Sequence, residues 1–100
     1  MSFYRPRMDR EESQYRHARR NARGRWGIDL TRELYDAWVA AIQNRNKGVG
    51  VRSLGRETRT RTHFAVEHDG REIPVVYDRE RGTIATVLPE SGLLGPKEEG

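Results

Sequence analysis

The alternation of apolar and polar side chains is clearest between Thr58 and Pro89, where it predicts three antiparallel strands and two tight turns. Asp69-Gly70 is a two-residue hairpin signal, because glycine tolerates the positive φ of a type I′ turn. The second expected turn, Arg79 to Gly82, also ends in a glycine. β-branched and aromatic residues fill the segments between the turns, as is typical of strands. A sheet of this size needs a second layer to pack on.

Two helical patterns precede the strands and supply that layer. The first helix is expected over residues 11–25, ends near Gly27, and has an apolar stripe of Tyr15, Ala18, Ala22 and Trp26. The second is expected to begin after an N-cap at Thr31 and to end near Asn44. Its apolar face is Leu34, Ala37, Trp38, Ala41 and Ile42. A short first strand is expected over 49–54, which makes the sheet three- or four-stranded.

The predicted fold class is therefore α+β, with two N-terminal helices packed on one face of a three- to four-stranded antiparallel β-meander. The expected organisation is a flexible basic arm over residues 1–10, in which Pro6 argues against a helix. A single domain follows over 11–89 and a disordered tail over 90–100. Within the strand 58–68, Phe64 and Val66 should face the helices. Arg61 and His63, which alternate with them, should then lie on the open face of the sheet.

Charge points to a polyanionic partner. The net charge is +4, and residues 1–27 hold eight arginines against three acidic residues. A basic surface on a small domain favours nucleic acid, although arginines can also serve only to keep a surface soluble. The residues expected to bind nucleic acid are Arg20, Arg23, Lys47, Arg59 and Tyr77.

Other features of the sequence narrow the class of protein. The chain has no cysteine, which suits a reducing compartment. It has neither an apolar run of transmembrane length nor an opening signal peptide, so we expect a cytoplasmic protein without a membrane partner. A P-loop, paired carboxylates and metal-ligand spacing are all missing from the sequence, so no cofactor and no metal site are expected.

Two motifs carry a resemblance to a known group of proteins. The row His17-Ala18 with Ala22, Arg25, Gly27 and Ile28 opens the chain, and VVYD (75–78) with IATVLP (84–89) closes it. Together they resemble the barnase–colicin D–RelE group of small bacterial and phage ribonucleases. The resemblance implies helices before a curved antiparallel sheet, metal-independent RNA cleavage, a role as a toxin, and an antitoxin or immunity protein as partner. Related sequences often carry arginine four residues after the histidine, where this chain has Asn21.

The chemistry of RNA cleavage selects candidate catalytic residues. Attack by the 2′-OH needs a base, a cation on the phosphorane and an acid for the 5′-oxygen. Histidine transfers protons near neutral pH, and arginine holds phosphate through two hydrogen bonds. The candidates are His17, Arg25, Arg61, His63 and Thr86. Each also has an ordinary structural interpretation, as a solvated helix residue or a strand residue.

Three functions remain open from the sequence. The first is a toxin-like endoribonuclease, a hydrolase-type nuclease. The second is a non-catalytic RNA- or DNA-binding module, which Asn21 favours. The third is a small protein that binds and inhibits another macromolecule, as phage-encoded proteins of this length often do.

Overall fold

The computed structural model describes residues 6–44 and 50–96, and within them the α+β prediction is confirmed. A four-stranded antiparallel sheet has the order β1-β2-β3-β4, which is a meander. The elements in chain order are α1 (Pro6–Trp26), α2 (Arg32–Gln43), β1 (Val51–Arg56), β2 (Arg61–His68), β3 (Arg71–Asp78), β4 (Thr83–Val87) and the 3₁₀ helix η2 (Glu90–Leu94).

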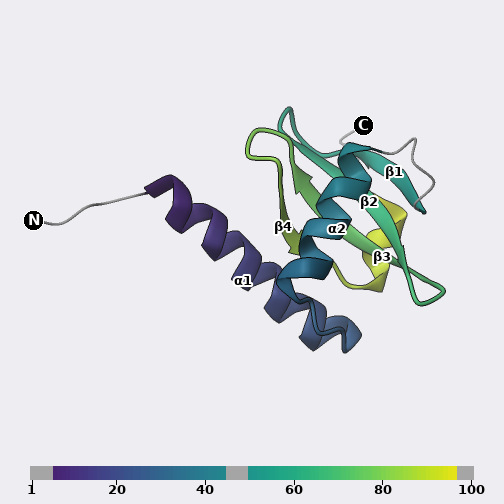
Figure 1. Ribbon diagram of the computed structural model, residues 1–100. Helices are drawn as coiled ribbons and strands as arrows, with labels where there is room; N and C mark the ends of the chain where they lie inside the picture. The colour runs from purple at the N-terminus through teal and green to yellow at the C-terminus, as the bar shows by residue number, and fades with distance from the viewer. Residues whose placement is uncertain (1–5, 45–49, 97–100) are drawn as a thin grey trace, which may run out of the picture.

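One hydrophobic core lies between the helices and one face of the sheet. Figure 1 shows α2 lying across the sheet, while α1 runs beside β4 and its N-terminal half extends beyond the sheet. The expected apolar stripes are largely confirmed, except that Ala37 is exposed and Tyr35 is buried in its place. The buried cluster includes Tyr15, Ala18, Ala22, Leu30, Tyr35, Trp38, Ile42, Phe64, Val66, Ile73, Val75, Ile84 and Val87.

Both predicted helix signals act as expected. Thr31 is the N-cap of α2, and its Oγ1 accepts a hydrogen bond of 3.1 Å from the Leu34 backbone N–H. Gly27 follows α1 with φ at +67°, and the Ile28 N–H donates to the Ala22 carbonyl at 3.1 Å. The Gly27 N–H donates to the Arg23 carbonyl at 3.0 Å, which is the αL capping motif and needs a left-handed residue at Gly27. The motif reverses the chain so that α2 can return over the sheet.

The turns and strand boundaries follow the predictions with two shifts. Asp69 and Gly70 both have positive φ, at 52° and 76°, which fits the type I′ hairpin. The expected strand from Thr58 begins instead at Arg61. The Thr58 hydroxyl accepts from the Thr60 and Arg61 backbone N–H groups, which holds the segment in a turn. β1 runs to Arg56, two residues further than expected, with an irregularity between Ser53 and Gly55.

The two ends of the domain differ from the expected boundaries. α1 begins at Pro6, inside the segment expected to be a flexible arm. Proline is well suited to the first helical turn, because its missing N–H would have no intrahelical partner there. At the other end, Glu90–Leu94 forms η2, inside the expected disordered tail, and packs against β3. No helix of the described residues is both long and apolar enough to cross a membrane.

Candidate functional site

A pocket of about 320 Å³ opens where α1 meets the sheet. Three of the five predicted catalytic residues line it, namely His17 from α1, Arg61 from β2 and Thr86 from β4. These residues come from three elements that are far apart in the sequence. The remaining lining residues are Ser13, Gln14 and Ala85.

Asn21 connects two of the predicted residues across the helix–sheet contact. Its Nδ2 donates to Thr86 Oγ1 at 2.7 Å and lies 3.3 Å from His17 Nε2. His17 and Asn21 are four residues apart and therefore stack on one side of α1. The imidazole of His17 is exposed, so a ligand in the pocket can reach it.

A buried carboxylate anchors α1 on the side of the pocket formed by Gln14. Asp78 is 1% exposed and accepts hydrogen bonds from the Gln14 amide at 3.4 Å and from the Arg81 side chain at 3.1 Å. The Gln14 carbonyl oxygen in turn accepts from the Thr83 hydroxyl. Burial opposes ionisation of Asp78, but the Arg81 and Gln14 hydrogen bonds together with the Arg81 charge outweigh it and lower the pKa of this carboxyl. α1 is thus fastened to both ends of the β3–β4 turn.

Arg61 enters the pocket with its charge available. No carboxylate lies within ion-pair distance of it among the residues whose side chains the structure describes. Asp78 is its cross-strand neighbour but makes its ion pair with Arg81 instead. A guanidinium without a protein partner is free to bind an anion such as a phosphate.

The expectation that His63 lies on an open sheet face is wrong. The residue is 8% exposed, and its Nε2 lies 2.7 Å from Glu57 Oε1. The chain after β4 covers this part of the face, since η2 packs on β3 and Pro96 lies beside Gly55, the cross-strand partner of His63. The buried Nδ1 of His63 has no hydrogen-bond partner within the described part of the chain. His63 shares its face with Thr86, because both pair with Val76.

Arg25 serves a different purpose from the one predicted. Its Nη1 donates to the Val87 carbonyl at 2.9 Å, and it does not line the pocket. The neighbouring Trp26 indole N–H donates to the Leu88 carbonyl at 2.7 Å. Both side chains therefore hold the end of α1 against the strand that carries Thr86.

The residues expected to bind nucleic acid are not gathered in one place. Arg20, Arg23 and Arg59 are exposed and have no carboxylate within ion-pair distance among the described side chains. Arg20 follows His17 by three residues, which places it one turn along the same side of α1. Tyr77 is buried on the core face, and Lys47 lies outside the described residues.

Sequence reasoning missed Gln14 and Glu57. Gln14 precedes His17 by three residues and Asn21 by seven, so helical spacing alone could have added it to the row. Glu57 gave no such signal, because it reaches His63 through the turn that the Thr58 hydroxyl forms.

No group of three or more His, Asp or Glu residues within 6–44 and 50–96 could hold a metal ion. Comparison of the chain with protein-family models, with curated proteins and with solved structures returned no match.

Proposed function

We propose that this protein is a metal-independent endoribonuclease of the toxin type. The observation that carries the proposal is the pocket in which His17, Arg61 and Thr86 converge from α1, β2 and β4. The pocket contains a proton-transfer group, a cation without an ion-pair partner among the described side chains, and a hydroxyl, which are the groups that cleavage by the RNA 2′-OH uses.

The proposed reaction is a transesterification at one phosphodiester. His17 accepts the 2′-OH proton while the 2′-oxygen forms a bond to phosphorus and the bond to the 5′-oxygen breaks. Arg61 stabilises the charge that develops on the phosphorane oxygens. The products are a 2′,3′-cyclic phosphate and a 5′-hydroxyl end, and the 5′-oxygen leaves with a proton.

Glu57 and His63 contact each other on this face, with 2.7 Å between Glu57 Oε1 and His63 Nε2. The Glu57 carboxylate is 46% exposed, and the Glu57 backbone N–H donates to the Arg61 carbonyl at 2.8 Å. Arg61 therefore lies next to both this pair and the His17 pocket. We assign protonation of the 5′-oxygen to this pair, and the positioning of His17 and Thr86 to Asn21.

The test is RNA cleavage by the purified protein in the presence of EDTA. The wild type should produce 2′,3′-cyclic phosphate ends. His17→Ala should reduce the rate by about 10²–10⁴-fold, the range for loss of a general acid or base. Arg61→Ala should reduce it by about 10²–10³-fold through loss of charge stabilisation. His68→Ala is the matched control, because His68 lies at the other end of β2, beside Trp38, and should leave the rate unchanged.

Two results would contradict these assignments. A wild-type rate that His17→Ala leaves unchanged would show that His17 is not the general base. Absence of nucleic-acid binding even at low salt would reject the proposal.

A non-catalytic nucleic-acid-binding module is the second candidate, and Asn21 favours it. The Asn21 amide engages both His17 and Thr86, yet it can neither transfer a proton near neutral pH nor carry a charge. This function predicts salt-dependent RNA binding without cleavage by the wild type.

A further inference from the structure

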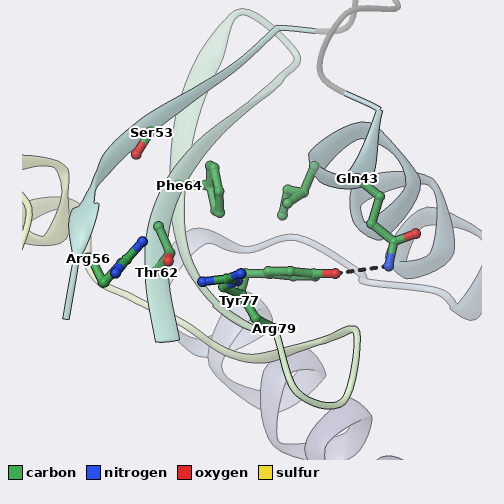
Figure 2. A pocket seen from close by; sticks show the side chains of 8 residues that line it. Gln43, Ser53, Arg56, Thr62, Phe64, Tyr77 and Arg79 are labelled. Carbon is green, nitrogen blue, oxygen red and sulfur yellow. Dashed lines mark hydrogen bonds between the residues drawn. The ribbon is translucent and has the colours of Figure 1, made fainter. Parts of the chain in front are cut away.

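A second and larger pocket, of about 430 Å³, lies on the core side of the sheet, beside the C-terminal end of α2. Its volume falls in the range of small-molecule sites. Its side chains come from β1, β2 and β3, from Arg79 directly after β3, and from the C-terminal end of α2 (Figure 2). The residues that matter for recognition are Ser53, Arg56, Thr62, Phe64, Tyr77 and Arg79.

Strand register builds the floor of this pocket. Arg56 pairs with Thr62, and Thr62 pairs with Tyr77, so the three side chains form one row across β1, β2 and β3. Ser53 and Phe64 pair in the next row on the same face. The row therefore joins a cation, a hydroxyl and an aromatic ring by backbone pairing, which holds them in place without a ligand.

Two arginines in the pocket have no ion-pair partner among the side chains that the structure describes. Arg56 and Arg79 are exposed, and neither has a carboxylate within ion-pair distance in the part of the chain whose side chains are described. Figure 2 shows them on either side of Thr62. Their neighbours differ, since Arg52 binds Glu72 at 2.7 Å and Arg81 binds Asp78 at 3.1 Å. Two guanidinium groups beside a hydroxyl are suited to a phosphate.

Aromatic rings close the other side of the pocket. Phe64 and Tyr77 meet edge to face, with ring centroids 6.1 Å apart. Gln43 Nε2 donates to Tyr77 Oη at 2.9 Å, which fixes the ring and leaves the phenolic proton available to a further acceptor. An aromatic wall with polar groups at its margins is suited to a planar heterocycle next to the phosphate.

We propose that this pocket binds a nucleoside 5′-phosphate, with Arg56 and Arg79 on the phosphate and the base beside Phe64 and Tyr77. The phosphate can belong to a free mononucleotide or to the 5′ end of an RNA strand. The proposal does not rest on the nuclease activity. Arg61 and Thr62 are adjacent in β2 and point to opposite faces, so the two pockets share no lining residue.

Isothermal titration of the full chain tests this site. 5′-AMP should bind saturably, whereas adenosine and inorganic phosphate should each bind at least about 10-fold more weakly. Arg56→Ala and Arg79→Ala should each weaken 5′-AMP binding by about 10- to 100-fold, the effect of losing a charged hydrogen bond. Arg16→Ala removes an equal charge from α1, outside the pocket, and should leave the affinity unchanged.

A 2′-O-methyl trinucleotide, which resists cleavage, distinguishes the two sources of the phosphate. Tighter binding of its 5′-phosphorylated form than of 5′-AMP assigns the site to an RNA end, and the reverse order assigns it to a free nucleotide. The proposal is overturned if 5′-AMP does not bind, if adenosine or inorganic phosphate binds equally well, or if both arginine variants retain wild-type affinity. The melting temperature of each variant is measured alongside, so that a loss of binding is not confused with unfolding.

Discussion

The Tyr35 hydroxyl joins α2 to β4, and Tyr35→Phe removes it without changing the ring. The hydroxyl donates to the Ile84 carbonyl at 2.9 Å and accepts from the Ile84 N–H at 3.1 Å. Tyr35 is 3% exposed and Ile84 is fully buried. The variant leaves two buried backbone groups unsatisfied, at roughly 1–3 kcal/mol each, so the free energy of unfolding should fall by about 2–6 kcal/mol. For a domain of this size the melting temperature should fall by at least about 8 °C.

Tyr15→Phe provides the matched control. The Tyr15 hydroxyl makes one hydrogen bond, to the Leu30 carbonyl at 3.1 Å, and its ring packs edge to face on Tyr35. Its loss should cost about 1 kcal/mol. Urea unfolding followed by circular dichroism measures both variants. A Tyr35→Phe effect equal to that of Tyr15→Phe, or below about 0.5 kcal/mol, would refute the argument, because it would mean that water satisfies Ile84.

Ionisation of the same hydroxyl should make the stability of the fold depend on pH in the alkaline range. Burial raises the pKa of Tyr35 to about 12, against the smaller lowering effects of its hydrogen bond to Ile84 and of the Arg32 charge. Folding therefore favours the neutral phenol. The stability linked to this group is complete below the unfolded pKa near 10 and decreases as the pH rises from there toward 12. The Tyr35→Phe variant should lack this part of the loss of stability at alkaline pH.

Two further predictions concern the core and the acid side of the pH profile. Trp38→Ala should lower the free energy of unfolding by about 3–5 kcal/mol, because Trp38 is 4% exposed in the core. A change below about 0.5 kcal/mol in urea unfolding would show that α2 is not docked through this side chain. Asp78 has a lowered pKa, so its stabilisation is present above the unfolded value near 4 and is lost as the pH falls below it. Asp78→Asn should therefore be less stable at neutral pH and show a shallower loss between about pH 4 and pH 2; an unchanged slope would assign the acid dependence to other carboxylates.

The parts of the fold that could be predicted are those with local causes. Gly27 and Thr31 act on backbone groups within a few residues, and Asp69-Gly70 reverses the chain by its own conformation. The apolar stripes of the two helices could also be predicted, because they depend only on the spacing of residues along the helix. The α+β meander followed because short connections make successive elements neighbours.

The parts that failed depend on contacts between distant segments. Alternation assigned His63 to the face opposite Phe64, which is correct, but it could not show that the chain after Pro89 returns over that face. Glycine and proline in that segment suggested disorder, whereas η2 packs against β3. Tyr77 was expected to contact nucleic acid because of its residue type. Its position in the alternation of β3 instead places it with Phe64 on the core side of the sheet.

Arg61 and Thr62 show why charge in the sequence could suggest a polyanion but not its site. Both lie in a basic segment, and a count of arginines does not distinguish Arg56, Arg61 and Arg79. The two-residue period of β2 separates them, because it directs Arg61 toward His17 and Thr62 toward Arg56 and Arg79. An RNA strand that touches all three arginines must pass around the end of the sheet, whereas small ligands would occupy the two pockets independently. Binding at one pocket therefore has no necessary effect on chemistry at the other, and each proposal stands on its own variants.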